Sequence, residues 1–216
     1  MIPFPDWRAL RPELELLRRG SPTIQAEARA IQGQPGWFDL RQRGNDEHGA
    51  DWCIFPLYLF DKLNLDNSAA MPGTCDLLAR IPHLRSAAIS RIGPGTEIQP
   101  HQGPPEISTF ILRVLMGLDV RGECVIRIGD EERPLVEGEL LMFDDLLFHQ
   151  SFNRSGAHRS VLIIDIDRPP PLPLELVEAP WAERSASWPR GWEEVGAAGR
   201  YIPVEDFARG WARSRA

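Results

Sequence analysis

The fold is decided by the stretch from Ser90 to Asp167, which begins SRIGPGTEIQPHQG (residues 90–103) and ends FDDLLFHQSFNRSGAHRSVLIIDID (residues 143–167). Apolar runs recur in it about every ten residues, separated by turn signals at Gly129-Asp130 and at 153–156. This texture is typical of an antiparallel sandwich or jelly roll. We predict strands at 87–92, 97–101, 110–118, 124–128, 132–136, 139–143, 148–153 and 159–166.

The rest of the chain is expected to join this β core in one compact domain. Residues 1–86 are predicted to form a helical and strand scaffold packed on the core, which occupies residues 87–167. The scaffold includes a helical region at 7–33 and a strand near 52–60, which Pro56 limits to an edge or a bulge.

Residues 168–216 begin as a proline-rich connector and end in a tail that carries several tryptophans. A disordered tail would be depleted in aromatic residues, so we expect this one to dock on the domain. We predict that it serves as a lid or as a dimer contact, because its tryptophans need burial.

The composition of the chain limits the kinds of partner that it is expected to bind. With 216 residues, 43% of them apolar, the chain can bury one sizeable core. A net charge of −7 argues against a nucleic-acid partner. Three cysteines without a close pair indicate neither a disulfide framework nor a thiolate zinc site. No signal peptide and no run of roughly 18 apolar residues is present, so we expect a cytoplasmic protein without a membrane partner.

Two histidines and two arginines form the candidate site. His101 and His149 each end or begin a predicted strand, and each is followed by a strand with an inward arginine, Arg113 or Arg159. A guanidinium on the apolar face of a strand costs several kcal/mol unless an anion pairs with it. The two arginines therefore predict two carboxylates.

Those carboxylates are either internal, for example Asp165 or Asp144, or belong to a ligand. Arginine suits bidentate capture of a carboxylate. His149 and Arg159 flank a turn, and a hairpin with an odd-numbered loop would place them opposite each other. A single ligand would then touch both a metal and an arginine.

The block SRIGPGTEIQPHQG, followed by LRVLMGL, IRIGDEERPLVEGELLMFDDLLFH and RSVLIIDIDRP, resembles the aspartyl/asparaginyl β-hydroxylase family of Fe(II)- and 2-oxoglutarate-dependent dioxygenases. The resemblance covers about residues 52–169. It implies a double-stranded β-helix, a cupin-like jelly roll whose mouth holds the metal. It also implies that His101 and His149 are the iron ligands.

The same resemblance implies that Arg159 and Ser90 hold the distal carboxylate of 2-oxoglutarate, and that Arg113 reaches its proximal end. Most such enzymes add a carboxylate ligand. Here Gly103 stands in that position, as in the resembled family, where water takes its place. Asp145 is then a candidate hydrogen-bond acceptor for that water.

Two departures from the family pattern concern the loop over the iron. The segment HQGPPEISTFILR is longer than usual, and Leu115 stands where the family has a histidine. We therefore expect the substrate, and part of the contact to the proximal end of 2-oxoglutarate, to differ.

The resemblance implies a dioxygenase that uses O2 to hydroxylate an unactivated C–H bond of a small molecule. We favour an amino acid, free or attached to a carrier protein. Trp52, Tyr58 and Gln102 are candidate substrate contacts, although each fits a core or scaffold role equally well. Two alternatives stay open: an iron halogenase with chloride at the glycine, and a non-catalytic cupin-like protein that binds a carboxylate. A homodimer is compatible with the sequence.

Overall fold

The structure, a computed structural model, describes residues 2–40, 51–169 and 192–216. Its strands are β1 (Phe38–Asp39), β2 (Trp52–Leu59), β3 (Lys62–Asn64), β4 (Leu84–Ile92), β5 (Glu97–His101), β6 (Ile111–Asp119), β7 (Cys124–Ile128), β8 (Glu131–Pro134), β9 (Leu140–Phe143), β10 (His149–Asn153), β11 (Arg159–Asp167) and β12 (Tyr201–Pro203). Its helices are α1 (Trp7–Leu10), the 3-10 helix η1 (Pro12–Leu14), α2 (Glu15–Arg19), α3 (Ser21–Ala30), α4 (Leu65–Ala70), α5 (Pro72–Leu78), α6 (Pro105–Ser108), α8 (Glu193–Ala197) and α9 (Phe207–Ser214).

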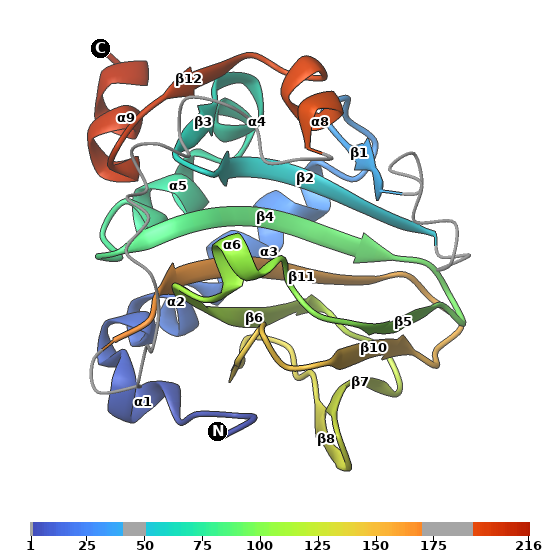
Figure 1. The fold of residues 1–216 in the computed structure, drawn as a ribbon. Helices are drawn as coiled ribbons and strands as arrows, with labels where there is room; N and C mark the ends of the chain where they lie inside the picture. The colour runs from blue at the N-terminus through green and yellow to red at the C-terminus, as the bar shows by residue number, and fades with distance from the viewer. Residues whose placement is uncertain (1, 41–50, 170–191) are drawn as a thin grey trace.

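The strands form two antiparallel sheets that face each other (Figure 1). The larger sheet has the order β12-β3-β2-β4-β11-β6-β9, with β1 paired to β2, and the smaller has the order β5-β10-β7-β8. From β4 to β11 the chain crosses repeatedly between the sheets, and only β7 and β8 follow each other within one sheet. This is the connectivity of a double-stranded β-helix, so the predicted fold class is confirmed.

The predicted core strands are all found, with bounds that differ by three residues at most. The turn signal Gly129-Asp130 closes the β7–β8 hairpin, in which Ile128 pairs with Glu131. Gly129 has a φ of +58°, which glycine adopts without strain.

The second turn signal, at 153–156, does not close a hairpin. It carries the chain from β10, which pairs with β5 and β7, to β11, which pairs with β4 and β6. The expectation that His149 and Arg159 oppose each other as hairpin neighbours is therefore wrong. The two residues lie on different sheets and can approach each other only across the interior.

Pro56 produces the predicted bulge, and β2 is not an edge strand. β2 lies between β3 and β4, and its register with β4 shifts between Pro56 and Tyr58. A bulge places an extra residue in one strand, so side chains beyond it exchange faces. Phe55, Leu57 and Tyr58 all belong to the core on the helical side of the sheet.

The N-terminal region is helical, as predicted, but it is divided into α1, η1, α2 and α3. Pro12 and Pro22 each lie in the first turn of their helix, where the missing N–H is tolerated. These helices and α5 cover the outer face of the larger sheet, where Ile24, Leu78 and Leu162 belong to one buried cluster (Figure 1).

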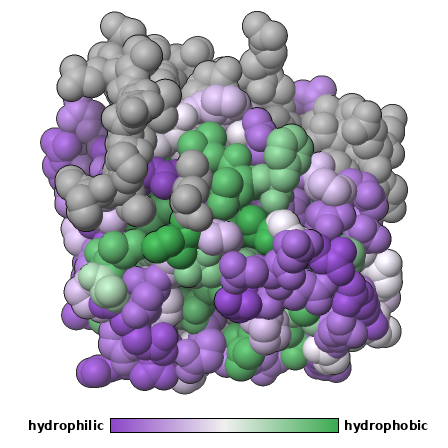
Figure 2. All heavy atoms as spheres, turned by 60° about the horizontal axis from the view of Figure 1, so that its bottom comes forward, coloured by the Kyte–Doolittle hydropathy of each residue, from purple (hydrophilic) through white to green (hydrophobic). Residues whose placement is uncertain are grey.

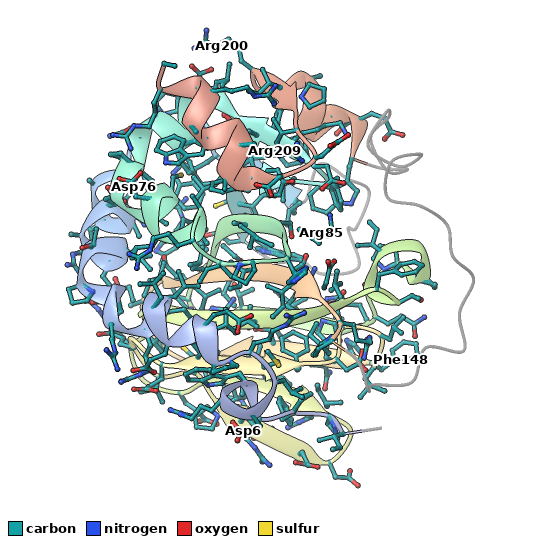
Figure 3. All side chains as sticks on the ribbon, turned by 90° about the vertical axis from the view of Figure 1, so that its left-hand side faces the viewer. Asp6, Asp76, Arg85, Phe148, Arg200 and Arg209 are labelled. Carbon is teal, nitrogen blue, oxygen red and sulfur yellow. The ribbon has the colours of Figure 1, made fainter. Side chains whose placement is uncertain are left out.

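The described part of the tail docks on the domain, as expected. β12 pairs with β3, and α9 buries Trp211, whose Nε1 donates a 2.8 Å hydrogen bond to Asp76 of α5. Figure 3 shows Arg209 of α9 and Asp76 in the same upper part of the molecule. The proline-rich connector, Trp181 and Trp188 lie outside the described residues.

One face of the molecule gathers apolar side chains in its middle and hydrophilic ones around them (Figure 2). Among the described residues, the large apolar side chains classed as exposed are Ile2, Val136 and Phe148. Within the same residues, no helix combines the length and the hydropathy needed to cross a membrane.

The docking of α9 gives a stability prediction. Trp211→Ala removes a side chain that is 6% exposed and should lower the free energy of unfolding by about 3–5 kcal/mol in urea titrations. Arg213→Ala on the same helix is the control, because Arg213 is exposed, and it should change stability by less than about 0.5 kcal/mol. Equal midpoints for the two variants would contradict the packing described for α9.

Candidate functional site

The two histidines of the candidate site lie side by side. His101 ends β5 and His149 begins β10, the two residues are paired in register, and their ring centroids are 4.3 Å apart. Nδ1 of each ring lies 2.8 Å from a backbone carbonyl oxygen, that of Gln99 or that of Leu147. A carbonyl oxygen can only accept, so Nδ1 carries the proton and Nε2 carries the lone pair. This is the usual arrangement of imidazoles that bind a metal.

Burial also favours the metal-binding form of His149. Its side chain is 4% exposed, and burial lowers its pKa to about 3, with further lowering by His101 and Arg113. The imidazole is therefore neutral near pH 7, as a metal ligand must be.

The described residues do not combine this pair with a carboxylate in a metal-binding cluster. No group of three or more His, Cys, Asp or Glu side chains in the described parts of the chain is arranged to hold a metal. Gly103 stands where such a ligand would be attached. A Cβ there would lie 1.8 Å from Oδ2 of Asp145 and 1.9 Å from Oγ of Ser108. The space beside Gly103 is thus already filled by these two side chains.

Asp145 lies next to the histidines and is fully buried. Its Oδ1 accepts a 2.6 Å hydrogen bond from Nη1 of Arg113, and its Oδ2 accepts one of 2.5 Å from Ser108. Oδ1 is also 3.7 Å from Nε2 of His149. Two donors therefore hold the carboxylate beside the position where both Nε2 lone pairs would meet a metal.

Arg113 is held by acids of the protein itself. Its Nε and Nη2 donate to the two oxygens of Asp165 at 2.8 and 3.0 Å, and Asp165 also accepts from Ser86. Burial alone would lower the pKa of Arg113, but Asp145 and Asp165 outweigh it and raise that pKa above its usual value. The internal ion-pair alternative thus holds for Arg113, and its contact with 2-oxoglutarate stays a prediction.

Arg159 is different because no described acid pairs with it. The residue is 2% exposed, and Nη1 donates a 2.7 Å hydrogen bond to Oγ of Ser151, while the buried Nε has no hydrogen-bond partner in the described parts of the chain. Burial without a carboxylate lowers the pKa of Arg159 to about 10. The group is still a cation near pH 7, and its surroundings suit a bound anion.

Ser90 and Trp52 extend the same inner face of the larger sheet. Ile92 of β4 pairs with Trp52 on one side and with Arg159 on the other, which places the three in one row. Nε1 of Trp52 donates a 3.0 Å hydrogen bond to Oγ of Ser90, and its ring lies 6.4 Å from that of His101. Trp52 therefore shares the inner face of the sheet with Arg159, and its ring lies near that of His101.

The expectation that Tyr58 contacts the substrate is corrected by the structure. Tyr58 is fully buried on the helical side of the sheet, where its hydroxyl donates to Asp61 and its ring packs edge-on against Phe207. The bulge after Pro56 turns Tyr58 to the face opposite Trp52. Gln102 is exposed next to His101 and remains a candidate contact.

Two residues of the site were missed by sequence reasoning. Ser151 follows His149 by two positions in β10, so strand alternation already places both on one face. Ser108 comes from α6 in the long loop after His101, and no periodicity in that segment points to it.

A sequence model of the family described as Aspartyl/Asparaginyl beta-hydroxylase matches residues 18–169. Human aspartyl/asparaginyl beta-hydroxylase is 28% identical over 170 residues, which cover 76% of this chain and 22% of that protein. The ornithine lipid ester-linked acyl 2-hydroxylase of Rhizobium tropici is 31% identical over 183 residues, 82% of this chain and 59% of that protein.

Among solved structures, an oxidoreductase of the 2OG-Fe(II) oxygenase family from Burkholderia pseudomallei aligns with a TM-score of 0.46 at 13% identity, covering 67% of this chain and 78% of that one. The chain spans only 22% and 59% of the length of the human and Rhizobium tropici relatives.

The buried charge network gives a second stability prediction. Arg113→Met leaves Asp145 and Asp165 without their cation, and breaking a buried ion pair on one side costs about 3–5 kcal/mol. Urea denaturation at pH 7 measures the loss. Arg127→Ala is the control, because Arg127 and Glu132 are 38% and 35% exposed and should lose less than about 1 kcal/mol. A loss below 1 kcal/mol for Arg113→Met would show that the network does not stabilise the fold.

Proposed function

The chain belongs to the aspartyl/asparaginyl β-hydroxylase family, and on that premise we propose that it is an Fe(II)- and 2-oxoglutarate-dependent dioxygenase. Its proposed reaction is hydroxylation of an unactivated C–H bond in a small substrate. One observation carries the proposal: a buried arginine with no acidic partner among the described residues and two imidazoles oriented for a metal lie in the same β-helix. Metal and carboxylate are the two ligands that this combination suits.

The cofactor positions follow from these side chains. His101 and His149 would hold Fe(II) through Nε2, and Arg159 would hold the distal carboxylate of 2-oxoglutarate with the hydroxyls of Ser90 and Ser151 beside it. When bound, iron and 2-oxoglutarate supply the oxidation: 2-oxoglutarate and O2 give succinate and CO2, and the second oxygen atom enters the C–H bond of the substrate.

The protein contributes binding, orientation and a dry interior. Arg159 would neutralise the carboxylate of 2-oxoglutarate, and Asp145, whose Oδ1 lies 3.7 Å from Nε2 of His149, would accept a hydrogen bond from a water on the metal. A cluster of buried side chains, drawn mostly from strands of both sheets, would help to keep bulk water from the reacting atoms. These buried residues are Leu115, Cys124, Ile126, Ile128, Leu135, Phe143 and Val161.

For the substrate we favour an amino acid, free or attached to a carrier protein. The names of both relatives contain an amino acid, aspartate or asparagine in one and ornithine in the other. Trp52 and Gln102 are the proposed contacts, since the ring of Trp52 lies 6.4 Å from that of His101 and Gln102 follows His101 in the chain. The name of the Rhizobium tropici protein puts its hydroxyl on an acyl chain, so acylated amino acids belong among the compounds tested.

The halogenase alternative is less well supported. Chloride on the metal would lie close to the carboxylate of Asp145, whose Oδ1 is 3.7 Å from Nε2 of His149. Two anions so close to each other repel. We therefore propose hydroxylation.

Turnover tests the proposal. Purified protein with Fe(II), 2-oxoglutarate and a panel of amino acids and acylated amino acids should form succinate only when O2 is present. Product mass, with and without chloride, should show one added oxygen atom in both cases. A chlorinated product would favour the halogenase. Tight binding of Fe(II) and 2-oxoglutarate without any succinate would favour the non-catalytic binding protein.

Metal binding should depend on both histidines. His101→Ala and His149→Ala should each lose Mn(II) binding in anaerobic titrations, while circular dichroism shows a retained fold. His158→Ala is the control, because His158 is exposed and its Nε2 lies 3.4 Å from a carboxylate oxygen of Asp51. Unchanged Mn(II) affinity in both site variants would rule out this pair as the metal site.

The anion site should depend on Arg159. Arg159→Ala should weaken 2-oxoglutarate binding to the Mn(II) protein by about 2–5 kcal/mol, because a desolvated ionic contact is lost. Arg159→Lys should restore only part of it, since lysine lacks the bidentate geometry. Calorimetry measures both, with Arg127→Ala as the surface control. Equal affinity in all four proteins would mean that Arg159 binds no part of 2-oxoglutarate.

A further inference from the structure

The loop between His101 and Arg113 brings a buried hydroxyl to the candidate metal site. The segment folds into α6, and Ser108 at its end is fully buried. Its Oγ donates a 2.5 Å hydrogen bond to Oδ2 of Asp145. This contact joins the loop after one histidine to the turn before the other.

The loop is fixed in place by a second, independent contact. Asp144 forms a buried ion pair with Arg168, whose Nη2 and Nε donate to the backbone oxygens of Ser108 and Thr109 at 3.3 and 3.2 Å. Both members are almost fully buried, at 6% and 2% side-chain exposure. The two consecutive aspartates thus hold the end of α6 from two sides. Asp144 binds Arg168, which donates to backbone oxygens of Ser108 and Thr109, and Asp145 accepts from the side chain of Ser108.

The oxygen that Ser108 binds is the one that lies toward Gly103. Oδ2 of Asp145 would be 1.8 Å from a Cβ at Gly103, whereas Oδ1 accepts from Arg113 and lies 3.7 Å from Nε2 of His149. Each oxygen of the carboxylate therefore has its own donor. A carboxylate whose two oxygens both accept hydrogen bonds from the protein must break one of them to bind a cation directly.

We propose that Ser108 is a positioning residue that keeps Asp145 outside the coordination shell of the metal, so that water and not this carboxylate completes it. The inference rests on the proposed function, because it requires a metal at His101 and His149. Without the hydroxyl, Oδ2 of Asp145 loses its donor and becomes a third protein ligand. The site then changes from two imidazoles to two imidazoles and a carboxylate.

Co(II) substitution tests this without turnover, because the visible bands of Co(II) report the number and type of its ligands. Ser108→Ala and Ser108→Gly, which both remove the hydroxyl and add no metal ligand, should each change the visible spectrum of the anaerobic Co(II) protein. Both substitutions should also lower the Kd for Co(II) by about tenfold or more, which is the size of effect found for residues that hydrogen-bond to metal ligands. Two variants are used so that a folding defect in one does not decide the result.

A matched control and a double variant show whether the effect passes through Asp145. Ser86→Ala removes a hydrogen bond of the same 2.5 Å length from Asp165, the other acid on Arg113, and should leave the Co(II) spectrum unchanged. In an Asp145→Asn background, Ser108→Ala should cause no further spectral change. A purely structural role for Ser108 would alter the spectrum in both backgrounds.

The outcomes separate this inference from the proposed function. A wild-type protein that binds no Co(II) would overturn the metal site and this inference with it. If the wild-type protein binds Co(II), and both Ser108 variants show its spectrum and a Kd for Co(II) within about twofold of its own, the role of Ser108 is overturned and the metal site stands.

Discussion

A guanidinium group buried without an acid is the constraint on which the interpretation of this fold depends. Arg159 lies on the inner face of β11 with 2% of its side chain exposed, and its one described hydrogen-bond partner is the hydroxyl of Ser151. Leaving such a cation unpaired opposes folding, and a bound carboxylate removes that cost. The proposed anion site would therefore reach its full stability only with its ligand bound.

The two inward arginines divide two tasks between them. Arg113 is bound by Asp145 and Asp165, so it stabilises a network that reaches the metal position through Asp145. Arg159 has no such acid among the described residues, and we propose that it binds the ligand. The double-stranded β-helix makes this possible because the larger sheet presents both arginines to one interior, while the smaller sheet presents the histidines across from them.

Much of this was predictable from sequence, since apolar runs bounded by turn residues locate strands well: β5 and β7 begin and end where expected. Inward arginines followed from alternation alone. The assignment of strands to the two sheets could not be predicted, because whether a turn closes a hairpin or carries the chain to the other sheet depends on which faces become buried. One bulge reversed the face of Tyr58. The contact of Ser108 with Asp145 depends on a loop path that no periodicity records.

Anaerobic absorption spectroscopy tests the central claim most directly, that one ligand spans the metal at the histidines and the guanidinium of Arg159. Fe(II) is added to the purified protein, followed by 2-oxoglutarate. The account predicts a weak visible charge-transfer band that appears only after 2-oxoglutarate is added and saturates at one equivalent per chain. Iron binding without any such band would contradict it, and would mean that Arg159 holds an anion that does not reach the metal.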